Sequence, residues 1–308
     1  MISRYTNGDE FMKFANMHLH SVFSDGIFTP FELCEKTSAM GYKAAVLTDH
    51  DCAAGFTAMK TAAEAFGLET MVGAEFYGVF KDKKTLHILG YDFDPNEPQM
   101  AEHLKKSKDC MTFLTKTRFD ACIAEGVLPA LSWNDVLNAA EDGAWICNEQ
   151  IFSAYLKKGI YFQKDYWDFI SKYRTPRVSV TRPYAVPDVE TVIRLICNAG
   201  GVAVLAHPYQ LTQHLPELYR LGIRGVECDH PEIESTDEIS ARQFAARHDM
   251  YITGGTDHTG KTGNNTERGD DPNHSLGIWD MAHTPYTADV YCGATKKEFM
   301  ALKSRIFG

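Results

Sequence analysis

The sequence predicts an α/β fold in which short parallel strands alternate with helices, as they do in a (β/α) barrel. Apolar, β-branched runs of strand length recur along the chain, and most are followed by a segment with helical start and stop signals. A long helical stretch interrupts this alternation in the middle of the chain. At 308 residues the chain is long enough for one large barrel or for a barrel with an inserted domain.

The first third of the chain shows the strand–helix alternation clearly. After a strand at 14–18, Thr29 can cap a helix, Pro30 suits its first position, and Glu32 completes a capping box. Gly41 is typical of the end of that helix. The elements expected next are a strand at 43–48, a helix at 53–66, a strand at 68–75, and strands at 77–80 and 85–91 joined by a turn.

The middle of the chain, from about 95 to 187, is expected to be mostly helical and amphipathic, with many lysines and aromatics. The alternation then resumes, with strands at 201–206, 222–227 and 250–256, helices at 189–198, 215–221 and 233–248, a polar loop at 260–274 and a last helix at 296–307. The predicted domains are therefore a barrel formed by residues 1–97 and 188–308 and a helical insertion subdomain at 98–187.

Composition and charge exclude some functions. The chain is 44% hydrophobic and 23% charged, which is ordinary for a globular protein, and its net charge is −10. An acidic chain argues against a broad basic surface for duplex nucleic acid or an anionic membrane. The eight cysteines form no C-x-x-C pair, so a zinc ribbon or redox motif is not expected.

No apolar segment resembles a signal peptide or a membrane span. A cytoplasmic protein is therefore expected, and no protein partner is implied.

Polar side chains of the kinds that bind metals cluster around the predicted strand ends. His18 and His20 are two residues apart, so both can point to one side of a strand, and Asp25 lies in the following turn. Four more residues follow apolar strands: His50, Glu75, His207 and Asp257. In (β/α) barrels the face at the C-terminal ends of the strands carries the chemistry.

The alternative interpretation is a set of separate hydrogen-bonded side chains. Burying so many imidazoles and carboxylates together without a cation would be costly. The pattern therefore predicts a multinuclear metal site that activates water for hydrolysis.

Six motifs, in this order, resemble those of the PHP family of metal-dependent phosphoesterases (polymerase and histidinol phosphatase domain): NMHLHSVFSDG, AVLTDHD, VGAEF, LHILGYD, AHP and TGGTDH. They span residues 14–258. The resemblance implies a distorted seven-stranded (β/α) barrel that holds two or three metals. The long insertion between His87 and His207 is similar to that of the subgroup that hydrolyses nucleotide 3′,5′-bisphosphates and short RNA 5′ ends, where the insertion supplies substrate contacts.

The resemblance also implies a ligand set. The first metal would be held by His18, His20, Glu75 and Asp257, the second by Glu75, His87 and His207, and a third by Asp25 and His50. The family usually ends its last motif with Asp-x-His. Here Asp257 is followed by His258 and Thr259, so His258 is the remaining candidate ligand, and both two and three ions stay open.

A second departure lies in the insertion, where Asn148, Glu149 and Gln150 stand at a place that often carries an arginine in the nucleotide-processing subgroup.

The expected reaction is hydrolysis of a small phosphomonoester, with a nucleotide or a 3′,5′-nucleotide bisphosphate among the candidates. A hydroxide between two cations bridged by Glu75 would attack phosphorus. His50 is a candidate for protonating the leaving oxygen, so His50, Glu75 and Asp257 are the predicted catalytic residues. The mixture of imidazole and carboxylate ligands suits Zn²⁺, Mn²⁺ or Fe²⁺ better than Mg²⁺.

A substrate phosphate needs a cationic clamp. The candidates are Arg177, Arg182, Lys158 and Arg268, and each can equally be a solvated surface charge.

Two other functions remain open at this point. One is an amidohydrolase-type metal hydrolase, although such enzymes commonly bridge their metals with a carbamylated lysine, and a glutamate favours the phosphoesterase. The other is a metal-binding module of the same family without activity.

Overall fold

The computed structural model describes residues 13–259 and 292–305. Its seven described strands form two sheets. The first sheet pairs β1 (Ala15–Leu19) with β2 (Ala44–Leu47), and the second has the order β3 (Gly73–Val79), β4 (Thr85–Tyr91), β5 (Val202–Leu205), β6 (Gly225–Asp229), β7 (Tyr251–Gly254). The structure confirms a mixed α/β fold.

The described strands do not form one continuous closed barrel. The two sheets meet only through isolated bridges, such as those between His50 and Glu75 and between Leu19 and His258. These bridges place the end of β2 beside β3 and the end of β1 beside the residues after β7. Side chains from all of these segments can therefore meet at one place.

The expectation of parallel strands throughout is wrong for β4, which is antiparallel to both β3 and β5. The predicted strands at 68–75 and 77–80 are instead the single strand β3. The short 3₁₀ turn η1 (Lys81–Lys83) joins it to β4, and so short a connection permits only antiparallel pairing. Glu75 consequently lies inside a hairpin rather than after a strand end, and His87 lies in the strand predicted at 85–91.

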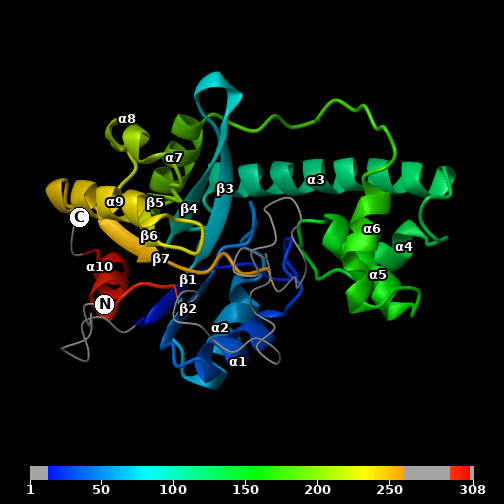
Figure 1. The fold of residues 1–308 in the computed structure, drawn as a ribbon, viewed down its shortest axis with the longest axis horizontal. Coiled ribbons are helices and arrows are strands. Elements are labelled where there is room, and N and C mark those ends of the chain that lie inside the picture. Colours follow the sequence, from blue (N-terminus) through cyan, green and yellow to red (C-terminus); the bar gives the residue numbers. More distant parts are fainter. Residues whose placement is uncertain (1–12, 260–291, 306–308) are drawn as a thin grey trace.

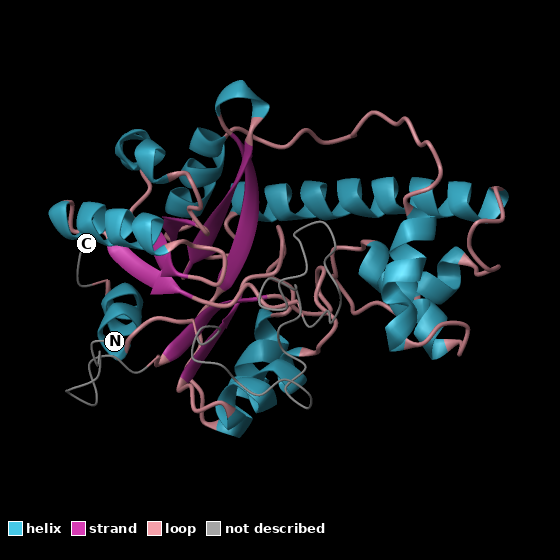
Figure 2. Cartoon of the chain, in the orientation of Figure 1, coloured by secondary structure: helices cyan, strands magenta, loops and turns pink. Residues whose placement is uncertain are grey.

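Helices cover the outside of the sheets (Figure 2). α1 (Pro30–Ala39) begins with the predicted capping box of Thr29 and Glu32, and α2 (Phe56–Phe66) ends at Gly67 in the left-handed conformation. The remaining outer helices are α7 (Val189–Asn198), α8 (Leu215–Leu221), α9 (Ser235–Arg247) and α10 (Lys296–Ser304). Ile193 and Ile196 of α7 belong to the same buried cluster as Phe76 of β3, so this helix holds the hairpin from its outer side.

The middle of the chain is helical, as the sequence predicts. It contains α3 (Pro98–Ala124), α4 (Trp133–Leu137), α5 (Asn148–Lys157) and α6 (Tyr166–Tyr173). Figure 1 shows α3 extending from the sheets to the group α4–α6, and the chain returning from α6 to α7. Phe119, Ile151 and Phe169 belong to one buried cluster there, which also includes Phe23 and Cys52 from the segments after β1 and β2. Among the described helices, none is both long and apolar enough to span a bilayer.

A buried polar contact joins α3 to the segment that follows β2. The hydroxyl of Ser107 donates to Asp51 Oδ2 at 2.6 Å, and His103 Nε2 lies 3.4 Å from Asp51 Oδ1. His103 Nδ1 lies 3.0 Å from the hydroxyl of Tyr184 on the returning segment. Asp51 follows His50 directly, so this contact connects the helical segment with one of the candidate metal ligands.

We expect Ser107→Ala to lower the free energy of unfolding by about 1–3 kcal/mol, because it removes the hydroxyl that donates to the buried Oδ2 of Asp51. Denaturant unfolding measures this loss. Thr117→Ala is the control: its hydroxyl donates to the Phe113 carbonyl of the same helix, and its loss should have a much smaller effect. Equal effects of the two substitutions would contradict the role of the Asp51 contact.

Candidate metal centre

The carboxylate of Glu75 stands at the centre of the site. It is 1% exposed and lies on the same face of the hairpin as Tyr77, which pairs directly with His87. Glu75 Oε1 lies 3.5 Å from His18 Nε2, 2.9 Å from His87 Nδ1 and 3.1 Å from His207 Nε2. Its Oε2 lies 3.3 Å from His20 Nε2 and 3.1 Å from His50 Nδ1. One carboxylate therefore faces five imidazoles.

Asp257 completes the first group, in which ligand atoms of His18, His20, Glu75 and Asp257 lie within 4.8 Å of one another. Its Oδ1 is 2.9 Å from His20 Nε2 and 3.5 Å from His18 Nε2. Asp257 has a φ of 51°, and His207 has a φ of 24°. Both values lie in the left-handed region, which is uncommon for residues other than glycine and is concentrated at functional sites.

Two of the groups that share residues with the first consist entirely of predicted ligands. Glu75, His87 and His207 form one, and His20, Asp25 and His50 form the other. His20 contributes to two groups because its ring has two nitrogens: Nε2 faces Glu75 and Asp257, and Nδ1 lies 3.3 Å from Asp25 Oδ1. The structure thus brings together eight of the nine residues that the sequence nominates as ligands.

The buried nitrogens and oxygens of the centre are arranged as ligands of cations rather than as hydrogen-bond partners of one another. Five such atoms are buried: His18 Nε2, both ring nitrogens of His20, His50 Nδ1 and Glu75 Oε2. None of them forms a hydrogen bond with another described residue. Buried polar atoms rarely lack a partner, and lone pairs that converge on one point are what a metal ion requires. The residues present therefore fit divalent cations.

Protonation in the absence of metal follows from burial and charge. Burial lowers the pKa of His50 to about 4, in spite of Asp25 and Glu75. Burial also acts to lower the pKa of His20, but Asp25, Asp257 and Glu75 outweigh it and raise this pKa to about 10. Burial acts to raise the pKa of Glu75, yet the imidazoles of His87, His18 and His50 hold it well below its ordinary value. Burial likewise acts to raise the pKa of Asp257, but His18 and His20 hold it well below its ordinary value, so Glu75 and Asp257 are both charged and attract a cation.

Comparison with known proteins decides the family. The family model described as the PHP domain matches residues 16–174, just over half of the chain. The chain belongs to the PHP domain family.

Two relatives show what similar PHP proteins do. The chain is 28% identical over 253 residues to a phosphoribosyl 1,2-cyclic phosphate 1,2-diphosphodiesterase of Eggerthella lenta, covering 80% of this chain and 95% of the relative. It is also 28% identical over 249 residues to a 3′,5′-nucleoside bisphosphate phosphatase of Chromobacterium violaceum, covering 79% and 86%. With the family match, these names support a metal-dependent hydrolase of phosphate esters and confirm the predicted reaction class.

A solved structure from Bifidobacterium adolescentis, described as a metal-dependent phosphoesterase, superposes with a TM-score of 0.71. It is 24% identical and covers 96% of this chain and 98% of its own. An identity of 24% shows a shared fold and no more, and the shared fold extends over nearly the whole of this PHP chain.

Glu227 supports the PHP centre from outside and was not singled out from the sequence. Its two carboxylate oxygens lie 3.1 and 3.2 Å from His18 Nδ1, and Oε2 accepts the backbone N–H of His207 at 2.8 Å. A proton on His18 Nδ1 directed at Glu227 leaves the lone pair of Nε2 for a metal. Outer carboxylates commonly orient ligating histidines in this way. A clue in the sequence was its position near the end of an apolar strand.

His258 is the one nominated ligand that belongs to none of the groups formed by described residues. Its backbone carbonyl accepts the N–H of His20, and its ring lies 5.8 Å from the ring of Phe28. Thr259, at the place of the family's usual last histidine, is buried. The group of His20, Asp25 and His50 is therefore assembled without a ligand from 258 or 259.

A cavity of about 400 Å³ adjoins the centre and reaches the helical segment. Asp25, His50 and Tyr77 line it on the side of the PHP centre. The lining residues from the helical segment include four aromatic side chains and two arginines, together with Asn148 and Glu149; the aromatic and arginine residues are Arg118, Trp145, Tyr166, Trp167, Tyr173 and Arg174.

Among described residues, the predicted phosphate contacts do not line this cavity. Arg177 and Arg182 are exposed on the returning segment, and Lys158 pairs with Asp135 at 2.6 Å. Arg268 lies outside the described residues.

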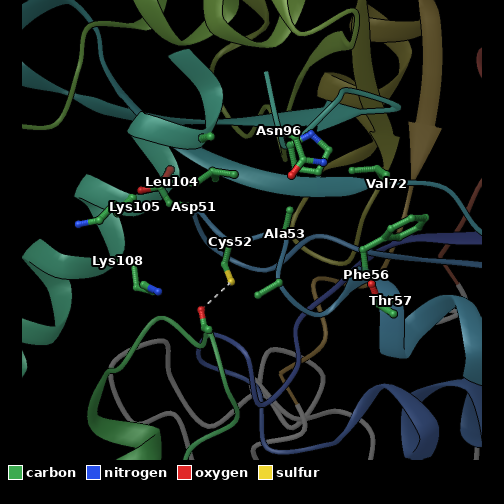
Figure 3. Close-up of a pocket in the computed structure, with 14 residues that line it drawn as sticks. Asp51, Cys52, Ala53, Phe56, Thr57, Val72, Asn96, Leu104, Lys105 and Lys108 are labelled. Atoms are coloured by element: carbon green, nitrogen blue, oxygen red, sulfur yellow. Dashed lines mark hydrogen bonds between the residues drawn. The ribbon is translucent and has the colours of Figure 1, made fainter. Parts of the chain in front are cut away.

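A second cavity, of about 560 Å³, lies between α3 and the start of α2. Figure 3 shows Lys105 and Lys108 on one side of it and Phe56 and Thr57 on the other. None of the described residues that line it belongs to the metal groups. It therefore does not extend the PHP centre.

We expect Glu75→Ala to lose most of its metal and its activity while the chain stays folded, because the substitution removes the oxygens that face five imidazoles. Metal per chain, phosphate release and the circular dichroism spectrum measure the three properties. Glu35→Ala, on the exposed face of α1, is the control and should change none of them. Full activity in Glu75→Ala would contradict the central role of this carboxylate.

Proposed function

We propose that this PHP enzyme removes a phosphate from a nucleotide-sized phosphomonoester, with 3′,5′-nucleoside bisphosphates as the first candidate class. The observation that carries the proposal is the cavity that Asp25 and His50 share with two arginines and several aromatic side chains. Its volume of about 400 Å³ is that of a small-molecule site.

The metal side of the cavity supplies the reaction. Two or three divalent ions, of Zn²⁺, Mn²⁺ or Fe²⁺ type, would be held by the three groups around Glu75. When bound, such ions lower the pKa of a water molecule and neutralise phosphoryl oxygens. Glu75 and Asp257 fix the charge of the centre, and Asp25 and His50 face both the centre and the cavity. In this proposal His50 would contact the leaving oxygen of the substrate.

The helical segment, residues 98–187, would recognise the rest of the substrate as a separate subdomain. Arg118 and Arg174 bring positive charge to a cavity that otherwise adjoins carboxylates, as a second phosphate requires. The ring nitrogens of Trp145 and Trp167 are buried and find no hydrogen-bond partner among the described residues. Both indoles line the cavity, so they can donate to a ligand or stack on a base.

Phosphate release from a panel of esters tests the substrate class. The panel contains 3′,5′-bisphosphates, 5′-mononucleotides, histidinol phosphate, a ribose 1,2-cyclic phosphate and a short 5′-phosphorylated RNA, each assayed with Mn²⁺-loaded protein. The proposal expects the highest kcat/KM for a 3′,5′-bisphosphate. Bound metal without release from any of them would favour an amidohydrolase-type reaction or an inactive module, and hydrolysis of simple amides separates these two.

We expect Arg174→Ala to raise KM for the best bisphosphate about tenfold or more, because a hydrogen bond to a charged group contributes roughly 1.5–3 kcal/mol. The change for a substrate with one phosphate should be much smaller. Arg177→Ala is the matched control, since Arg177 is exposed and does not line the cavity. Equal effects of the two substitutions would contradict a phosphate contact at Arg174.

A further inference from the structure

His230 stands at the edge of the metal centre without belonging to the predicted ligand set. It follows β6 directly, is 4% exposed, and its ring centroid lies 5.9 Å from that of His18 and 5.3 Å from that of His207. Its Nε2 lies 3.6 Å from Asp257 Oδ2 and has no hydrogen-bond partner among the described residues. This buried nitrogen therefore points at the side of Asp257 that faces away from His20.

The other ring nitrogen determines where the proton lies. The backbone N–H of Glu232 donates to His230 Nδ1 at 3.0 Å, so Nδ1 must present a lone pair. In a neutral imidazole the proton then resides on Nε2. Nε2 consequently has an N–H group to donate and no lone pair to offer a metal.

This tautomer excludes the simplest interpretation of the cluster. His18, Glu227 and His230 lie close enough to form a metal group, and His230 could then replace the histidine that is missing at Thr259. However, Nδ1 of His230 is occupied by Glu232, and Nδ1 of His18 faces Glu227 at 3.1 Å. Neither nitrogen in this cluster is available as the free ligand that such a site would need.

We propose that His230 is a positioning residue that holds Asp257 through an Nε2–H···Oδ2 hydrogen bond when metal is bound. Asp257 needs such support because its side chain is 24% exposed and its backbone has a φ of 51°. With Oδ2 held, Oδ1 stays directed at His18 and His20, 3.5 and 2.9 Å away. The inference rests on the metal centre of the proposed function and is independent of the substrate.

Two isosteric variants separate this role from ligation and from a purely structural role. In His230→Asn the amide oxygen can still accept the N–H of Glu232, but no donor reaches Asp257. In His230→Gln the amide nitrogen lies near the position of Nε2 and restores the donor. The metal-free form of each variant is titrated with Mn²⁺ by calorimetry, and its melting temperature is recorded without metal.

The expected result is that His230→Asn weakens Mn²⁺ binding about 10–100-fold, as loss of a partner outside the metal ligands typically does, while His230→Gln stays within a few-fold of the parent. In an Asp257→Asn background, His230→Asn should add little further loss. Three results would overturn the proposal: Gln as damaging as Asn, which indicates ligation; unchanged Mn²⁺ affinity in His230→Asn; or full additivity with Asp257→Asn. None of these readouts uses a phosphoester, so a wrong substrate class cannot produce them.

Discussion

The burial of one charged carboxylate constrains the rest of this structure. Glu75 is 1% exposed, and the imidazoles around it hold its pKa well below the ordinary value although burial opposes ionisation. A buried charge without compensation is strongly destabilising, so the fold must bring imidazole N–H groups or positive charge to it from several elements. The imidazoles come from β1 and the residue that follows it, from β4, and from the segments after β2 and β5. The same imidazoles direct lone pairs toward one region. The side chains that stabilise the buried charge of Glu75 are therefore also the candidate metal ligands.

The backbone near the centre is shaped by this convergence. A Cβ on Gly255 would lie 2.4 Å from the backbone nitrogen of His18, so only glycine lets the end of β7 approach β1 this closely. Asp257 follows two residues later with a positive φ, and His207 also has one. Such conformations persist where surrounding contacts determine them, and here the backbone N–H groups of Asp257 and His207 are held by the His18 carbonyl and by Glu227. The backbone of Asp257 is thus fixed by His18 itself, and that of His207 by Glu227, the carboxylate that contacts His18.

Short-range rules allowed much of the centre to be predicted from sequence. His18 and His20 share a face because strands have a period of two, and the capping box of Thr29 and Glu32 depends on four neighbouring residues. Glu75 was assigned to a strand end incorrectly, because its place beside His87 depends on the antiparallel register of β3 and β4. Arg118 and Arg174 are more than fifty positions apart and meet at one cavity only through the packing of α3 and α6. Which ring nitrogen of His230 carries the proton depends on the hydrogen bond from the backbone N–H of Glu232, and no pattern of residues in the sequence predicts that bond.

The segment after β2 connects the metal groups with the adjoining cavity and with α3. His50 faces Glu75 and lines the cavity, while the next residue, Asp51, receives Ser107 of α3. The backbone N–H of Asp51 also donates to the carbonyl of Glu75 at 2.8 Å. The same short segment therefore bonds to the hairpin that holds the central carboxylate and to the helix that carries Arg118. Because both bonds are buried, they hold the cavity wall and the metal groups in one relative position, and the substrate proposed for this cavity would lose less entropy on binding than it would between independently moving parts.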